Sequence, residues 1–188
     1  MRTLFVTCAL LALASCHGHS QPTANQSSAT APEVPGKGID RSHKGQTAPK
    51  ATFEDPQGIK VSMAGFEHRP VLVNLWATWC APCVKELPTL DRLARAHQDG
   101  SLAVVAISQD EAPEASVQAF FKAHNIKSLD AFHDPKMTWS GAVNAEVLPT
   151  SILFDANGRE VWRYVGDQDW TTPEAAKLLA EGGVSPPK

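Results

Sequence analysis

The chain has 188 residues, of which 43% are hydrophobic and 20% charged, a size and composition suited to one folded domain. Its 17 lysine and arginine residues stand against 20 acidic residues, which gives a net charge of −3, and the basic residues form no block. This charge pattern argues against nucleic acid as a partner.

The first residues have the pattern of a secretory signal. Arg2 precedes an apolar stretch over residues 4–14, which is too short to span a bilayer. The stretch runs into Leu-Ala-Ser-Cys at residues 13–16, which resembles the lipobox of bacterial lipoproteins. We therefore predict a lipoprotein signal peptide over residues 1–15 and a lipid anchor on the sulfur of Cys16. The alternative is ordinary secretion, with cleavage after a small residue and Cys16 left as a free thiol.

The next segment, residues 16–50, is rich in Ser, Thr, Gln, Pro, Gly and Ala and contains no aromatic residue. Such a segment buries too little apolar surface to offset the entropy lost when a backbone becomes ordered. We predict a flexible tether over residues 16–50, which would hold a domain off a lipid surface. A short disordered tail is expected at residues 184–188.

Residues 51–183 contain nearly all the large apolar side chains and are expected to form one domain. Strand patterns occur at residues 71–76, 102–107, 151–154 and 160–165, with a shorter one around 59–63. Helix patterns occur at residues 81–96, 113–124, 136–143 and from 172 onward. The alternation predicts an α/β fold with a central mixed sheet flanked by helices. The Asn157-Gly158 turn predicts that the sheet ends in an antiparallel hairpin, followed by a C-terminal helix.

The most informative motif is Cys80-Ala81-Pro82-Cys83, which follows a strand pattern and opens a helix pattern. Unsatisfied N–H groups and the positive end of the dipole at a helix start stabilise a thiolate. Cys80 is therefore the expected nucleophile. Cys83 lies one turn further along, where it can attack a mixed disulfide that Cys80 forms with a substrate. It is the expected resolving thiol of a thiol-disulfide redox site.

The remaining cysteines and histidines indicate no metal site. The chain has four cysteines, and the two outside this motif, Cys8 and Cys16, lie in or next to the signal segment. A closed zinc site takes four ligands, which a single C-x-x-C pair does not supply. The histidines of the predicted domain are scattered and have no ligand spacing. A buried, inert thiol pair is the alternative to a redox site.

The motif and its surroundings resemble the TlpA/ResA-like branch of the thioredoxin superfamily. The matching residues are the run Val-Leu-Val-Asn-Leu-Trp-Ala-Thr-Trp-Cys-Ala-Pro-Cys at 71–83, Glu86-Leu87-Pro88, and Val147-Leu148-Pro149-Thr150 ahead of the turn at 155–158. The resemblance implies a thioredoxin-like fold and an extracytoplasmic, membrane-tethered thiol-disulfide oxidoreductase. Its only redox group would be the Cys80–Cys83 pair, with no bound cofactor and no metal.

The resemblance also implies roles for residues outside the cysteine pair. Pro149 corresponds to a cis-proline that packs against the two cysteines, which leaves the backbone of Leu148 free to pair with substrate. Without the resemblance, Pro149 would be expected to be a trans proline at the start of a strand. Glu86 matches an active-site acid whose pKa is raised by desolvation and which carries the proton of Cys83. The alternative for Glu86 is an exposed carboxylate on a helix surface.

Residues around the cysteine pair are expected to have supporting roles. Asn74 stands where thioredoxin has a buried aspartate, so that proton transfer would fall to Glu86 or water. Trp79 is expected to cover the sulfurs and to offer substrate an apolar contact, whereas Trp76 is expected in the core. Ala81 and Pro82 would tune the redox potential. The remaining tryptophans, Trp139, Trp162 and Trp170, are expected to serve packing.

The leading functional hypothesis is reduction of protein disulfides on the periplasmic side of the bacterial envelope. By the resemblance, electrons would come from a membrane thiol donor of the DsbD/CcdA type, and clients would include apocytochrome c or copper-site assembly proteins. The same cysteine pair can instead form disulfides, because spacing does not encode the direction of exchange. A third hypothesis is a metal-delivery module, although such modules favour C-x-x-x-C with a distant histidine.

Overall fold

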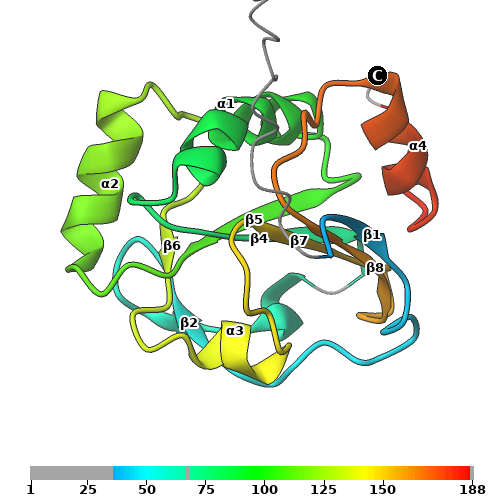
Figure 1. The fold of residues 1–188 in the computed structure, drawn as a ribbon, viewed down its shortest axis with the longest axis horizontal. Helices are drawn as coiled ribbons and strands as arrows, with labels where there is room; N and C mark the ends of the chain where they lie inside the picture. The colour runs from blue at the N-terminus through cyan, green and yellow to red at the C-terminus, as the bar shows by residue number, and fades with distance from the viewer. Residues whose placement is uncertain (1–35, 67, 187–188) are drawn as a thin grey trace, which may run out of the picture. The chain divides into compact units, whose positions relative to one another are not determined.

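A mixed eight-stranded sheet forms the centre of the fold, in the strand order β1-β8-β7-β4-β5-β6-β2-β3 (Figure 1). The computed structural model describes residues 36–66 and 68–186. The strands are β1 (Gly38–Asp40), β2 (Phe53–Glu54), β3 (Lys60–Val61), β4 (Val71–Trp76), β5 (Ala103–Ser108), β6 (Phe132–His133), β7 (Thr150–Phe154) and β8 (Glu160–Val165). The helices are η1 (Met63–Phe66, 3-10), α1 (Ala81–Ala96), α2 (Glu114–Ala123), α3 (Thr138–Ala142) and α4 (Pro173–Ala180).

Strand β4 lies in the middle of the sheet, parallel to β5 and antiparallel to β7. Its side chains alternate between two apolar cores: Leu72 and Trp76 belong to one, which also contains residues of α1, α2 and α4. Val73 and Leu75 belong to the other, which contains residues of α3. We call these the α1-side core and the α3-side core; Figure 1 shows α1 and α4 on one face of the sheet and α3 on the other. Burial on both faces explains why β4 is almost continuously apolar.

The predicted hairpin is confirmed, since β7 and β8 pair antiparallel through the turn at Asn157-Gly158. Gly158 has a φ of +69°, which a residue without Cβ adopts readily. The carboxylate of Asp155 accepts the backbone N–H groups of Asn157 and Arg159, both at 2.9 Å. These bonds close the turn locally and set the register of the two strands.

The folded part begins earlier than the sequence predicts. Strand β1 pairs antiparallel with β8, with Gly38 opposite Val165, and Thr47 forms a bridge with Arg159. The predicted tether over residues 16–50 is therefore wrong for residues 38–50. Backbone hydrogen bonds to an open strand edge require no apolar side chains, so composition does not reveal them. The rest of that tether up to residue 35, the signal peptide at 1–15 and Cys16 lie outside the described residues.

The other end of the domain also extends further than predicted. Val184, the first residue of the expected tail, is 7% exposed and belongs to the α1-side core. The chain reaches it through Gly182, where a Cβ would lie 2.6 Å from Cδ2 of Leu153, and Gly183, whose φ is +83°. This glycine turn folds the chain back onto the domain. Residues 187–188 of the expected tail are not described.

Smaller differences concern the first half of the domain. The strand expected around residues 59–63 is limited to Lys60–Val61, because Met63 begins the short helix η1. By contrast, α1 and β8 have the predicted bounds, 81–96 and 160–165. In the parts of the chain that the structure describes, no helix combines the length and the apolar character needed to cross a membrane.

Candidate active site

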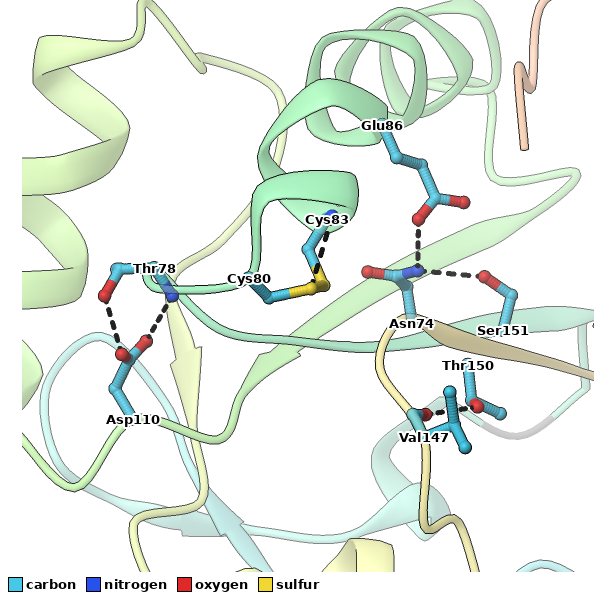
Figure 2. The surroundings of a disulfide bond; sticks show 9 residues. All are labelled: Asn74, Thr78, Cys80, Cys83, Glu86, Asp110, Val147, Thr150 and Ser151. Carbon is cyan, nitrogen blue, oxygen red and sulfur yellow. Dashed lines mark hydrogen bonds between the residues drawn. A yellow bond between two sulfur atoms is a disulfide. The ribbon is translucent and has the colours of Figure 1, made fainter. Parts of the chain in front are cut away.

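The two cysteines of the motif form a disulfide at the N-terminus of α1, with an S–S distance of 2.07 Å (Figure 2). Strand β4 ends at Trp76, and Cys80 caps the helix, its Sγ accepting the backbone N–H of Cys83 at 3.3 Å. Cys80 is 6% exposed and Cys83 is 1% exposed. Cys80, at the helix start, is therefore the more accessible of the two cysteines.

The loop before Cys80 is held by a buried carboxylate that the sequence did not point to. Asp110 accepts the backbone N–H of Thr78 at 3.0 Å and its hydroxyl at 2.6 Å. Ser108 donates its hydroxyl to the same carboxylate at 2.7 Å. Strands β4 and β5 are parallel, so their carboxyl ends lie side by side, with Trp76 opposite Ser108. The available signal was the polar triplet Ser-Gln-Asp at 108–110, directly after an apolar strand.

The residues around the more accessible sulfur face solvent. Trp79 is 68% exposed, and both Ala81 and Pro82 are exposed. Trp76, by contrast, is fully buried and stacks on Phe121 with ring centroids 5.3 Å apart, which confirms its expected place in the core. The motif thus presents an aromatic ring and two small apolar residues to an approaching partner.

The proline segment at residues 147–150, which also carries the resemblance, lies at the same end of the sheet as the cysteine loop. The Leu148–Pro149 peptide bond is cis, as the resemblance implied, and Pro149 is buried while Leu148 is half-buried. Thr150, the first residue of β7, lies opposite Leu75 of β4 and donates its hydroxyl to the carbonyl of Val147 at 2.7 Å. The antiparallel register therefore brings the proline to the end of β4 from which the cysteine loop starts.

Glu86 lies on α1 and is 2% exposed, so the alternative of a solvent-exposed carboxylate is wrong. Trp170 donates its indole N–H to Oε1 at 2.5 Å, and Asn74 donates its amide to Oε2 at 3.2 Å. The net pKa of Glu86 is raised to about 7, and burial is the largest cause. The hydrogen bonds from Trp170 and Asn74 oppose this rise, and the negative charge of Asp167 adds to it. The expected upward shift is therefore present, and desolvation is its main cause.

Asn74 and Trp170 complete this polar cluster. The Nδ2 of Asn74 also donates to the hydroxyl of Ser151 on β7 at 2.9 Å. Trp170, together with Trp139 and Trp162, is buried as expected for packing, and it stacks on Trp162 at 6.2 Å. Its bond to Glu86 was not foreseen, because 84 residues separate the two in sequence and no motif connects them. Among the described residues, no three His, Cys, Asp or Glu side chains are grouped so as to hold a metal ion.

Comparisons with known proteins agree with this geometry. The family model named Redoxin matches residues 43–179. The thiol-disulfide oxidoreductase ResA of Bacillus cereus is 32% identical over 124 residues, covering 66% of this chain and 70% of that protein. A solved thiol-disulfide oxidoreductase from Bacteroides fragilis is 26% identical with a TM-score of 0.61, covering 71% of this chain and 100% of that one.

A Chlorobium tepidum structure that carries the name thiol:disulfide interchange protein DsbE has a TM-score of 0.64 at 24% identity. The match covers 73% of this chain and 96% of that one, which shows a shared thioredoxin-like fold. The Redoxin match contains the disulfide, Glu86 and the cis-proline. The chain therefore belongs to the Redoxin family, among its TlpA/ResA-like thiol-disulfide oxidoreductases.

Proposed function

We propose that this thiol-disulfide oxidoreductase reduces disulfides in other proteins, with Cys80 as nucleophile and Cys83 as resolving thiol. The observation that carries the proposal is the asymmetry of the two sulfurs: Cys80 is the more accessible and accepts a helix N–H, whereas Cys83 is 1% exposed. The Cys80 thiolate attacks a client disulfide and forms a mixed disulfide. Cys83 then attacks Cys80, the client leaves as a dithiol, and the Cys80–Cys83 disulfide forms.

Substrate binding is assigned to the exposed surface around Cys80. Trp79 offers an apolar ring beside the nucleophile, since 68% of it is exposed. Leu148 would pair its backbone with an extended client segment, because Pro149 after it is cis and lies near the cysteine loop. Neither residue takes part in the chemistry. Their role is to hold the client sulfur in line with the sulfur of Cys80.

Glu86 is proposed as the group that takes the proton of Cys83. With a pKa of about 7, its carboxylate is partly ionised at neutral pH and can accept a proton at that point. Removing the proton converts Cys83 into the thiolate that attacks the mixed disulfide. Each of the two departing client thiolates takes up a proton, and these two protons replace the one lost by Cys80 and the one taken from Cys83.

The direction of exchange is proposed from the resemblance to the TlpA/ResA-like branch, in which a membrane thiol donor keeps the dithiol reduced. The helix start favours the Cys80 thiolate, and the sulfur of Cys80 accepts the N–H of Cys83. Ala81 and Pro82 lie between the two cysteines and are proposed to tune the redox potential. Strong protein oxidants owe their potential to a stabilised reduced form, so the potential itself decides the direction.

The reduction potential tests this direction. The purified protein is equilibrated with dithiothreitol at known ratios of thiol to disulfide, and the fraction of oxidised Cys80–Cys83 is read by thiol alkylation. A value near that of thioredoxin, about −270 mV, is expected for a reductant. A value near about −120 mV, typical of DsbA, would make the protein a disulfide donor and contradict the proposal.

Trapping of clients tests the roles of the two cysteines. A Cys83→Ala variant cannot resolve the mixed disulfide, so client proteins are expected to remain attached to Cys80 on non-reducing gels. The matched Cys80→Ala variant is expected to trap none. Equal trapping by both variants, or by neither, would contradict the assignment of nucleophile and resolving thiol.

The site of action is proposed from the sequence pattern alone. The signal pattern at residues 1–15 and the lipobox ending in Cys16 support a lipoprotein on the periplasmic side of the envelope. There a membrane donor of the DsbD/CcdA type would re-reduce the disulfide, and apocytochrome c or copper-site assembly proteins would be clients. Labelled palmitate should be incorporated by the parent and lost in Cys16→Ala, whereas an unlabelled parent would indicate plain secretion.

A further inference from the structure

In the disulfide form, no described residue donates a hydrogen bond to the side-chain oxygen of Asn74. Asn74 is fully buried in β4, and its Nδ2 donates to both Glu86 and Ser151. Its Oδ1 is also buried and has no partner among the described residues. Buried acceptors without a donor are rare because the lost hydration is not replaced. This oxygen therefore requires an explanation.

The orientation of the amide follows from its neighbours. A carboxylate can only accept hydrogen bonds, so the NH₂ group of Asn74 must face Glu86 whenever that residue is ionised. This places Oδ1 on the opposite side of the amide. Figure 2 shows that this oxygen points toward the Cys80–Cys83 disulfide. Neither sulfur of a disulfide carries a proton, so neither can donate to it.

We propose that reduction supplies the missing donor: the Cys83 thiol donates its S–H to Oδ1 of Asn74, which keeps Cys83 protonated until Glu86 takes the proton. Two electrons and two protons from the thiol reductant convert the disulfide into two thiols. Cys80, at the helix start, then loses its proton more readily than Cys83. The inference deepens the proposed function and rests on it, and Asn74 is a positioning residue in it, because its amide transfers no proton.

The consequence is an order of ionisation. A hydrogen bond from the neutral thiol to Oδ1 favours that neutral form and so raises the pKa of Cys83. Cys83 therefore does not compete with Cys80 for the client and does not ionise before a mixed disulfide exists. The Nδ2 of the same amide donates to Oε2 of Glu86 at 3.2 Å. One side chain thus orients both the proton donor and the proton acceptor.

The charged groups on the elements packed around the disulfide include Asp110, which follows β5 and holds the loop before Cys80. Glu86 faces the cluster from α1, and Asp167 follows β8, where it forms ion pairs with Lys37 at 2.8 Å and Lys85 at 3.3 Å. The β4 and β7 residues that line the cluster, such as Asn74, are neutral. An effect of Asn74 on Cys83 must therefore be separated from an effect that passes through Glu86.

The test is the pKa of Cys83, read from the pH dependence of alkylation with mass spectrometry of each cysteine in the reduced, full chain. Asn74→Leu removes the acceptor at similar volume and is expected to lower the Cys83 pKa by about one unit. The same shift is expected in a Glu86→Gln background. Ser151→Ala, which leaves Oδ1 in place, should give the parent value. An unchanged Cys83 pKa, or a shift that vanishes in the Glu86→Gln background, would overturn the inference.

The same bond should appear in the redox equilibrium. Because the reduced form alone contains it, Asn74→Leu is expected to shift the equilibrium with dithiothreitol toward the disulfide by about tenfold, which is about 30 mV more negative. If the parent itself exchanges no disulfides, the proposed function fails. If the parent exchanges normally while Asn74→Leu keeps the parent equilibrium, the inference alone fails.

A spectroscopic measurement covers the case in which Asn74→Leu does not fold. The side-chain carbonyl carbon of Asn74 is observed by NMR in the reduced parent and in Cys83→Ala, which lacks the donor. The parent resonance is expected to lie downfield, as for an amide oxygen that accepts a hydrogen bond. Identical shifts in the two proteins would overturn the inference.

Discussion

Two glutamates of this protein are almost equally buried but have opposite surroundings. Glu86, in the α1-side core, is 2% exposed and is held by the neutral donors Trp170 and Asn74. Glu160, on β8, is 3% exposed, and Arg163 donates to both of its oxygens at 2.8 Å. Arg163 also donates to the carbonyl of Val143 at 2.7 Å, at the end of α3. One carboxylate has a cation beside it, and the other has none among the residues that the structure describes.

The difference teaches what makes a buried acid available for proton transfer. A bidentate guanidinium pairs with both oxygens of a carboxylate and fixes it in place, so such a pair serves the architecture. Neutral donors stabilise the ionised form less than burial destabilises it, and the pKa of Glu86 rises to about 7. The protein therefore has a structural ion pair on the α3 side and a titrating acid beside its disulfide.

The largest expected effect comes from removing the cation of the structural pair. Arg163→Met leaves Glu160 buried without its partner, and the free energy of unfolding should fall by about 3–5 kcal/mol. Urea unfolding of the oxidised protein at pH 7 measures this. Arg41→Met is the matched control, because Arg41 pairs with Glu181 on the surface and its loss should cost less than about 1 kcal/mol. Equal losses would contradict the distinction between the two kinds of pair.

The next effect concerns the pH dependence of stability. The pKa of Glu86 is raised from 4.5 to about 7, so between these values the folded protein holds a proton that the unfolded chain releases. The stabilisation is complete below about pH 4.5 and is lost as the pH rises through about 7, a decrease of about 3 kcal/mol. Glu86→Gln should remove this decrease. Urea unfolding from pH 5 to 8 measures it, and parallel curves for parent and variant would contradict it.

A smaller effect is expected for the indole donor. Trp170→Phe removes the N–H that Glu86 accepts, so the pKa of Glu86 should rise further, and stability at pH 8 should fall by about 2 kcal/mol more than at pH 5. Trp162→Phe is the control, since its indole donates to the neutral carbonyl of Leu178 at 3.0 Å. Its loss of stability should be the same at both pH values, and a pH-dependent loss there would contradict the assignment.

The smallest effect should come from Asp167, whose negative charge raises the pKa of Glu86. Asp167→Asn should lower that pKa by a small amount, because the charge is removed and Lys37 and Lys85 lose their partner. A ¹³C NMR titration of the Glu86 carboxyl carbon measures the shift. It should be opposite in sign to the shift in Trp170→Phe, and an upward shift would show that charge at this loop does not govern Glu86.

The sequence predicted the elements whose signals are local. The bounds of α1 at 81–96 and of β8 at 160–165 follow from apolar periodicity, a proline in the first turn and a strong turn sequence. Strand β1 and the packed Val184 were missed, because a backbone pairing with a strand edge and a chain reversal at Gly182 leave little trace in composition. Tertiary contacts, rather than intrinsic propensity, order those segments.

The site divides in the same way. By itself, the sequence determined the C-x-x-C pair, the helix that presents it and the acid one turn later, because Cys80, Cys83 and Glu86 lie within seven residues and share one helix. Only the tertiary structure decided which residues surround that acid. Trp170 comes from 84 positions away and Ser151 reaches Asn74 from 77, so their contacts exist only once the sheet and α1 are packed. Burial is a property of that packing, and it is the main cause of the raised pKa of Glu86.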